Sequence, residues 1–404
     1  MKSPPPPVVS AGAAAARPSI QNRGWPLLRL GFRPFYILGA LLACASVPIW
    51  IASFLGWMPL DVTVTPLLWH AHEMLFGFAT AIIVGFLLTA VKAWTGLATP
   101  RGALLGGLAA LWLVARLAAL GAPYAVYAAL DMLLLPIVAV ILLRVLIRAG
   151  NRRNLPLIGI LVLLSLANLA FHLAVMGAIH LPPVQALYAG LALIVMIECV
   201  MAGRVVPAFT TSVNPGLKIK LPRWQEMATL GVTALALLLW VCAPPGIVSA
   251  VTLALAGVMH VARMAQWHPL KTLSRPILWV LHAAYAWIPI GLLLLAMAQM
   301  GWVTVSVGVH ALAIGATGGL IIGMLTRTAR GHTGRPLQAS RAEVLAYALV
   351  MGAALIRVFF PIVLPQWYVP GLIAAAAAWS VAFGIYLVMF TPWLLQTRAD
   401  GKDG

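Results

Sequence analysis

Long apolar stretches separated by short polar connections fill most of the chain. Each stretch has roughly the 20 residues that a helix needs to cross a membrane at about 1.5 Å per residue. They lie near residues 34–56, 70–93, 102–120, 123–147, 155–178, 184–206, 226–243, 245–264, 275–299, 304–325, 342–361 and 368–392. The pattern predicts an all-α, polytopic transmembrane helix bundle of about twelve helices. The break at Ala243-Pro244-Pro245 is its weakest boundary, because a kink there would make the number of spans odd.

Basic residues lie on one side of this predicted bundle. Lys and Arg concentrate in the N-terminal tail, in alternate connections and in the C-terminal tail, and the intervening connections contain none. Of the 26 basic residues only Arg116 and Arg357 lie toward the other side. Under the positive-inside rule, the basic connections and both termini are cytoplasmic, which requires an even number of spans.

The polar segments suggest a simple domain organisation. Residues 1–24 contain four consecutive prolines and an Ala/Arg stretch without the apolar core of a signal sequence, so they are interpreted as a disordered cytoplasmic tail. Residues 25–396 form the transmembrane domain, which could consist of two six-helix halves, 25–213 and 224–396. Residues 397–404 form a C-terminal tail. No short internal repeat is evident.

Composition supports a membrane protein and excludes several other classes. Of the 404 residues, 63% are hydrophobic and 8% are charged, and the mean hydropathy is +1.01, far from the values of a soluble domain. The net charge of +18 is spread between apolar runs, so the lipid bilayer is the expected partner and nucleic acid is not. The three cysteines form no CxxC pair, which argues against a disulfide framework or a thiolate metal site.

Ionisable side chains within the predicted spans are the candidates for chemistry, because each costs about 2.5–3.5 kcal/mol or more in a bilayer. The predicted topology sorts them by depth. Those toward the periplasmic side are His70, His72, Glu73, Asp131, His172 and His310. Those toward the cytoplasmic side are Glu198, Arg204, His260, Arg263 and His282.

The segment Trp69-His70-Ala71-His72-Glu73-Met74 is the densest of these groups. On a regular helix, His70 and His72 point about 200° apart, whereas His70 and Glu73 share a face. Both imidazoles can bind one metal only if the helix begins after His70, which the upstream Pro66 permits. The alternative is an interfacial Trp/His belt. Imidazole without thiolate suits haem iron or copper.

His260 and His282 lie at matching depth on helices joined by one loop, so they are expected to face each other across a haem or a metal. Met264, one turn beyond His260, is a softer candidate ligand, and Tyr285 flanks His282. The alternative for each histidine is a hydrogen bond to a neighbouring helix.

Four further side chains have competing interpretations. Glu198 either pairs with Arg204 or carries protons, and Arg204 is also a candidate for cofactor binding. Arg116 and Arg357 either extend to the membrane surface, hold haem propionates, or anchor Asp131. A fifth side chain, His332, lies in a predicted cytoplasmic turn, where it is a candidate for a ligand, metal or anion contact.

Several motifs resemble the NnrS family of bacterial inner-membrane proteins. They are Gly31-Phe32-Arg33-Pro34-Phe35, Trp69-His70-Ala71-His72-Glu73-Met74-Leu75-Phe76-Gly77, Gly85-Phe86-Leu87-Leu88-Thr89-Ala90 with Trp94-Thr95-Gly96, Gly203-Arg204-Val205-Val206-Pro207-Ala208-Phe209-Thr210, and Arg327 with Gly331-His332-Thr333-Gly334-Arg335. The resemblance covers most of the chain. It implies a multi-pass protein of the bacterial inner membrane that contains b-type haem and copper and acts in nitric oxide metabolism or nitrosative-stress defence. It implies no particular ligand set.

The leading hypothesis is therefore an oxidoreductase that binds or reduces nitric oxide at a His-ligated metal, as in denitrification. Glu73 or Glu198 would carry protons, and a quinol or another donor would supply electrons. The metal-ligand candidates are His70, His72, His172, His260, His282, His310 and His332. One alternative is a transporter, although no pair of broken helices in matching positions is evident. Another is a haem-based nitric oxide sensor or scaffold without turnover.

Overall fold

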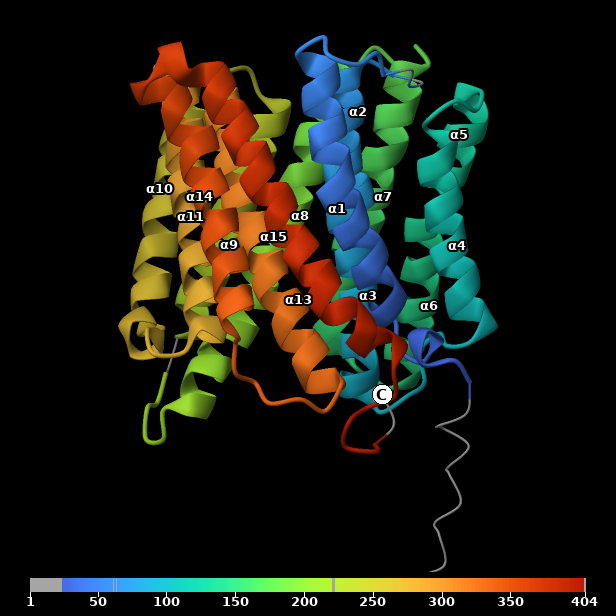
Figure 1. Ribbon diagram of the computed structural model, residues 1–404. Coiled ribbons are helices and arrows are strands. Elements are labelled where there is room, and N and C mark those ends of the chain that lie inside the picture. Colours follow the sequence, from blue (N-terminus) through green and yellow to red (C-terminus); the bar gives the residue numbers. More distant parts are fainter. Residues whose placement is uncertain (1–23, 61, 63, 220–221, 403–404) are drawn as a thin grey trace, which may run out of the picture.

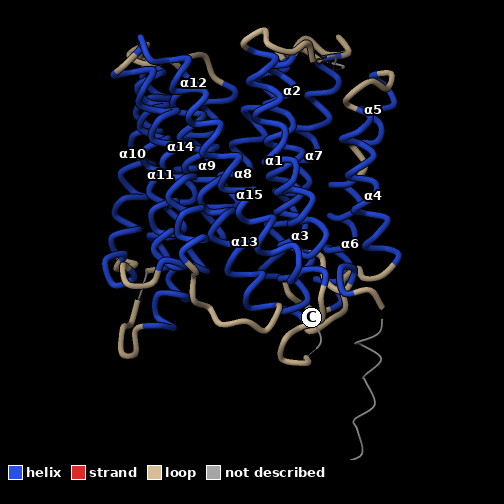
Figure 2. The backbone as a smooth tube through the Cα atoms, viewed as in Figure 1, coloured by secondary structure: helices blue, strands red, loops and turns tan. Residues whose placement is uncertain are grey.

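The computed structural model describes residues 24–60, 62, 64–219 and 222–402. Within these ranges the chain is helical and contains no strand (Figure 2). The predicted disordered tail lies outside the described residues, apart from Gly24. The start of the described chain and the C-terminus lie at the same end of the bundle, as an even number of spans requires (Figure 1). The predicted all-α, polytopic fold is thus confirmed.

Eleven helical segments of the described chain are long and apolar enough to cross a membrane, and the shorter helix α4 occupies the place of the predicted third span. The helices are α1 (Phe32–Phe54), α2 (Pro66–His72), α3 (Thr80–Thr95), α4 (Ala103–Ala118), α5 (Tyr124–Asp131), α6 (Leu134–Arg148), α7 (Leu155–Val175), α8 (Pro183–Val213), α9 (Arg223–Cys242), α10 (Ile247–Ala265), α11 (Pro276–Gln299), α12 (Val305–His310), α13 (Gly319–His332), α14 (Arg341–Val363) and α15 (Tyr368–Leu395). Short 3-10 turns precede or join some of them: η2 (Pro26–Leu28), η4 (Arg152–Asn154), η5 (Pro269–Thr272) and η7 (Pro365–Trp367).

The helices end where the sequence stops supporting them. In lipid, an α-helix satisfies its backbone hydrogen bonds within one segment, so the polar breaks must fall at the membrane surfaces. Prolines begin α2, α8 and α11, where a missing N–H costs no helical hydrogen bond. The break at residues 243–245 is real, because α9 ends at Cys242 and α10 begins at Ile247.

Two spans contain a π-helical segment in the half of the bundle opposite the C-terminus, which we call the outer half. In one, η3 (Glu73–Ala79) joins α2 to α3, and in the other, η6 (Ala311–Gly318) joins α12 to α13. Each π segment begins directly after a histidine, His72 or His310. Such π segments are rare and are often found at functional sites.

The sequences of these two spans align without a gap. The alignment pairs His72, Gly77, Gly85, Thr95 and Gly96 with His310, Gly315, Gly323, Thr333 and Gly334. Because the two π segments begin at paired positions, the match is structural as well as sequential. The two spans therefore share a structural feature that no short repeat in the sequence had suggested. Most of the identical residues are separated by several positions within each span. The matching starts of the two π segments show which positions to pair.

The helices pack in three consecutive groups of four spans: α1–α6, α7–α10 and α11–α15. Within each group, spans adjacent in sequence pack together. Between groups, α6 packs on α7, α10 packs on α11, and α15 packs on α1, which closes a ring. The division into halves 25–213 and 224–396 stays a prediction.

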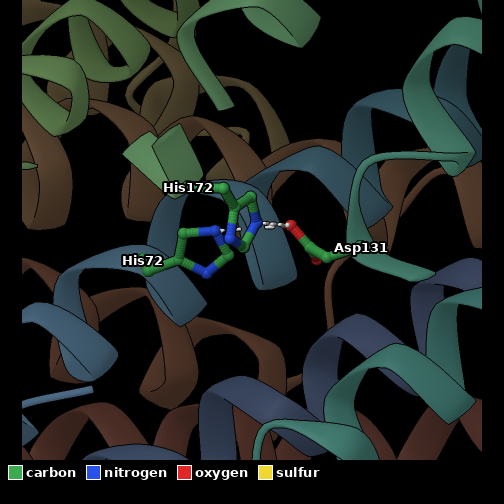
Figure 3. A group of neighbouring side chains, drawn as sticks. All are labelled: His72, Asp131 and His172. Carbon is green, nitrogen blue, oxygen red and sulfur yellow. Dashed lines mark hydrogen bonds and ion pairs between the residues drawn. The ribbon is translucent and has the colours of Figure 1, made fainter. Parts of the chain in front are cut away.

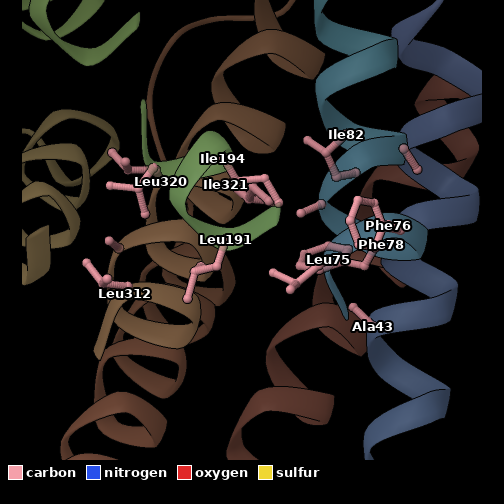
Figure 4. Close-up of a cluster of buried hydrophobic side chains, with 14 of the residues drawn as sticks. Ala43, Leu75, Phe76, Phe78, Ile82, Leu191, Ile194, Leu312, Leu320 and Ile321 are labelled. Carbon is pink, nitrogen blue, oxygen red and sulfur yellow. The ribbon is translucent and has the colours of Figure 1, made fainter. Parts of the chain in front are cut away.

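The second span of each group lies toward the centre of this ring. Helix α8 packs against both η3 and η6. Figure 4 shows their apolar side chains facing one another, among them Leu75, Phe78, Leu191 and Ile194. Several polar side chains on these spans, among them His72, Glu73 and Thr317, are consequently buried.

Candidate metal centre and cofactor cavity

Three buried side chains from different spans form a candidate metal centre. His72 of α2, Asp131 of α5 and His172 of α7 each offer one ligand atom, and these atoms lie within 4.8 Å of one another (Figure 3). Asp131 Oδ2 is 3.1 Å from His172 Nε2 and 3.4 Å from His72 Nε2. Two imidazoles and a carboxylate are a donor set that suits a divalent transition metal.

A second layer of polar groups fixes both imidazoles. The hydroxyl of Tyr127 is 2.9 Å from His72 Nδ1, and the hydroxyl of Tyr124 is 2.8 Å from His172 Nδ1. The side-chain amide of Asn168 donates to Asp131 Oδ2 at 2.7 Å, and its oxygen lies 2.9 Å from His72 Nε2. Partners on Nδ1 hold each ring so that Nε2 is directed toward Asp131, which is how proteins commonly orient metal-binding histidines.

The charges around this centre sum to an excess negative charge. The guanidinium of Arg116 donates to Glu73 Oε1 at 2.7 Å and also pairs with Asp131. One arginine thus faces two carboxylates inside the bundle, and a buried excess charge is costly unless a proton or a cation balances it. A metal ion between His72, Asp131 and His172 would supply that balance.

The sequence prediction anticipated part of this centre. His72, His172 and Glu73 were candidates, and anchoring Asp131 was one of the roles considered for Arg116. The expected shared face of His70 and Glu73 is wrong, because the π segment begins at Glu73 and Glu73 instead contacts His72 and Arg116.

The orienting residues Asn168, Tyr124 and Tyr127 were missed. Their signal was present in the helical spacing, since Asn168 precedes His172 by four residues and Tyr127 precedes Asp131 by four.

His70 points away from this centre. Helix α2 begins at Pro66, before both histidines, so the two imidazoles do not share a metal. The ring of His70 stacks on Trp50, with 4.1 Å between ring centroids. It lines a second feature, an outer cavity of about 540 Å³ whose wall also carries His310 and Arg357.

Toward the other end of the bundle, His260 and His282 contact different partners instead of each other. His260 Nδ1 lies 2.5 Å from the hydroxyl of Tyr285, and His260 Nε2 lies 2.9 Å from the hydroxyl of Thr233. His282 Nε2 lies 3.0 Å from the hydroxyl of Thr210. These contacts match the alternative interpretation, in which each histidine bonds to a neighbouring helix. Met264 is a partly buried packing residue at the edge of the apolar core.

A separate ion pair lies beside His260. Arg263 pairs with Glu226 and donates to the Tyr285 hydroxyl at 2.9 Å. The sequence analysis did not anticipate Glu226 as its partner. This network joins α9, α10 and α11 and accounts for the buried charge of Arg263.

The expected pair between Glu198 and Arg204 is not formed. Arg204 donates to Asn154 Oδ1 at 2.6 Å. Glu198 lines a smaller inner cavity of about 100 Å³, and its Oε2 is buried without a hydrogen-bond partner among the described residues. Thr317 lies on the walls of both the inner and the outer cavity.

His332, in the last turn of α13, packs beside Phe32 at 5.5 Å between ring centroids. Its role as a ligand stays a prediction.

Comparison with known proteins agrees with the motifs. A family model described as "NnrS protein" matches residues 26–398, nearly the whole chain. No curated protein matches the chain.

Proposed function

The chain belongs to the NnrS family, and from this premise we propose that it is a haem- and copper-containing protein of the bacterial cytoplasmic membrane that binds and reduces nitric oxide. The observation that carries the proposal is the group formed by His72, Asp131 and His172, in which two imidazoles and a carboxylate are buried together with excess negative charge. A buried centre of this kind suits a cation better than a neutral substrate.

The residues of this centre have distinct roles in the proposal. His72, His172 and Asp131 hold the metal, while Tyr124 and Tyr127 orient the two imidazoles. Copper held by these three side chains would supply the capacity to bind nitric oxide and pass electrons to it. Nitric oxide is small and uncharged, so it reaches a buried site from the bilayer without a polar channel.

Protons and electrons must come from elsewhere. Glu73 Oε1 lies 3.4 Å from His72 Nδ1. Because Glu73 is not a proposed metal ligand, its carboxylate would be free to carry protons to the site. Glu198, on the inner cavity, is placed to carry protons toward the centre of the membrane. A quinol or another reductant supplies the electrons.

The test is to purify the full chain and measure copper, iron, haem and nitric oxide consumption with a reduced quinol. His72→Ala and Asp131→Asn are expected to lose copper and consumption, whereas His180→Ala, in an exposed loop, retains both. Glu198→Gln is expected to retain haem and metal but to consume nitric oxide more slowly. A metal-free preparation with full activity would contradict the proposal. Stoichiometric binding without consumption would instead indicate a sensor.

One observation favours transport as the second candidate. Two spans have π segments, η3 and η6, at matching positions, and internal structural repeats that meet at the binding site are typical of transporters. The sequence had suggested no such pair. Uptake of copper or an anion into proteoliposomes, abolished in Glu198→Gln, would support transport. Absence of uptake together with consumption of nitric oxide would exclude it.

A further inference from the structure

The outer cavity has the size and the wall of a cofactor site. Its volume of about 540 Å³ lies within the range of roughly 300–1,000 Å³ that is typical of cofactor and ligand pockets. Residues of α1, α2, η3, α8, α12, η6, α14 and α15 form the wall, which is mostly apolar and aromatic. It contains no Asp or Glu. A large flat ligand with an apolar body therefore fits this space better than a metal ion alone.

Two imidazoles reach this cavity from different spans. His310 Nδ1 lies 2.7 Å from the carbonyl oxygen of Ser306 and donates a hydrogen bond to it, which leaves the lone pair on Nε2 for a ligand. His70 is held by stacking on Trp50, and its Nδ1 is buried without a hydrogen-bond partner among the described residues. Orphaned imidazole nitrogens inside a membrane protein are costly unless something binds them.

The cavity wall also carries a buried arginine, Arg357, that forms no ion pair with a described carboxylate. Arg357 is only 8% exposed, and its Nη2 donates to the Ser306 hydroxyl at 3.3 Å. In the described part of the chain, no Asp or Glu forms an ion pair with it. An arginine in this position is well suited to hold a ligand carboxylate.

A comparison of the two spans that contain π segments accounts for the absence of a carboxylate beside Arg357. Arg116 and Arg357 lie on the third spans of their groups, α4 and α14, each next to a span with a π segment. In the first group, Glu73 follows His72 and pairs with Arg116. In the third group, the position paired with Glu73 is Ala311. The third group therefore offers Arg357 no carboxylate at the position where the first group pairs Glu73 with Arg116.

We propose that the outer cavity binds one b-type haem, with His70 and His310 as its two axial ligands and Arg357 paired to a propionate. This inference rests on the proposed function for the presence of haem and adds the site and its ligands. Because both axial positions are filled by protein, this haem relays electrons and does not bind nitric oxide. His70 and His72 lie two residues apart on α2 and face different sides of it, so the haem site and the His72 centre flank the same helix.

The experiment uses the full-length protein purified in detergent. Haem is quantified by extraction, and its axial ligation is read from electron paramagnetic resonance and near-infrared magnetic circular dichroism. We expect a six-coordinate, low-spin haem that does not bind carbon monoxide when reduced. His70→Ala and His310→Ala should each lose most of the haem, and the haem that remains should be high-spin and should bind carbon monoxide.

Two further variants separate ligation from folding. In His70→Gly and His310→Gly, added imidazole should restore the low-spin spectrum, which a misfolded protein would not do. Arg357→Gln should retain the low-spin spectrum and lose haem more readily in competition with apomyoglobin. His72→Ala should lose copper and retain haem, and His180→Ala should retain both.

The outcomes distinguish this inference from the proposed function. An unchanged low-spin spectrum and haem content in both His70→Ala and His310→Ala would overturn the haem site, as would a wild-type protein that contains copper but no haem. A wild-type protein whose haem depends on both histidines, but which does not consume nitric oxide, would uphold the site and contradict the proposed function.

Discussion

Two buried arginines in corresponding parts of the molecule have opposite surroundings. Arg116 faces two carboxylates, Glu73 and Asp131, whereas no described carboxylate pairs with Arg357. Both are less than a tenth exposed, so neither extends into water. The two residues therefore allow the cost of breaking a buried ion pair to be compared with the cost of retaining an unpaired charge.

We expect Arg116→Leu and Arg357→Leu to change stability in opposite directions in haem-free protein. Arg116→Leu leaves two buried carboxylates without their cation and should destabilise the fold by about 3–5 kcal/mol. Arg357→Leu removes an unpaired buried charge, so the melting temperature should stay the same or rise. Thermal unfolding in detergent measures both. Equal destabilisation by the two variants would show that Arg357 has a structural partner.

The tyrosines around the metal centre provide a second comparison at the residue scale. Tyr127 lies 2.9 Å from His72 Nδ1, whereas the buried hydroxyl of Tyr386 has no hydrogen-bond partner among the described residues. Tyr127→Phe should lower copper affinity about 10- to 100-fold, because the ring of His72 loses its orienting contact. Tyr386→Phe should leave copper affinity unchanged. Competition with a chelator measures both, and equal affinities in the two variants would argue against the role of Tyr127.

At the scale of elements, glycines in the π segments leave space into which a side chain of a neighbouring helix packs. A Cβ at Gly315 of η6 would overlap the indole ring of Trp287 on α11. Gly352 of α14 has no heavy atom within 4 Å of a Cβ position and serves as a control.

We expect Gly315→Ala to destabilise the protein by about 1–3 kcal/mol, because the tightly packed indole must move. Gly352→Ala should be neutral or slightly stabilising, since alanine favours the helix. Thermal unfolding of both variants in detergent checks this. A neutral Gly315→Ala would mean that η6 and α11 are less closely packed than described.

The spans themselves were predictable from sequence, because a bilayer requires a long apolar run for every helix. The predicted break after Cys242 and the opposite directions of His70 and His72 follow from proline chemistry and helical period alone. Deviations from regular structure were not predictable. Glu73 begins a π segment and pairs with Arg116, and neither feature follows from a regular period of 3.6 residues.

Contacts between distant spans were the other failure of prediction. Matching depth suggested that His260 and His282 meet, but depth does not specify which way a helix is rotated. Their rings instead contact hydroxyl groups on α9, α11 and α8. Helical spacing places Asn168 on the same face as His172, but only the structure shows that this face contacts His72 of α2 and Asp131 of α5.

At the scale of the whole molecule, charge and geometry assign the two ends of the bundle. The connections rich in Lys and Arg lie at the end that also carries Gly24 and the C-terminus (Figure 1). The metal centre and the outer cavity lie toward the opposite end, near the starts of α2 and α12. The positive-inside rule then predicts that both sites lie near the periplasmic surface.

We expect cysteine labelling in whole cells to show this orientation. Cys242 is exposed near the outer end of α9, so the background should be Cys242→Ser. Ala178→Cys, in the exposed connection after α7, should react with a membrane-impermeant maleimide in intact cells. Ser274→Cys, in the exposed connection before α11, should react only after permeabilisation, because Lys271 and Arg275 hold that connection in the cytoplasm. The reverse pattern would place the metal centre on the cytoplasmic side, and Glu198 would then be a route for protons from the periplasm.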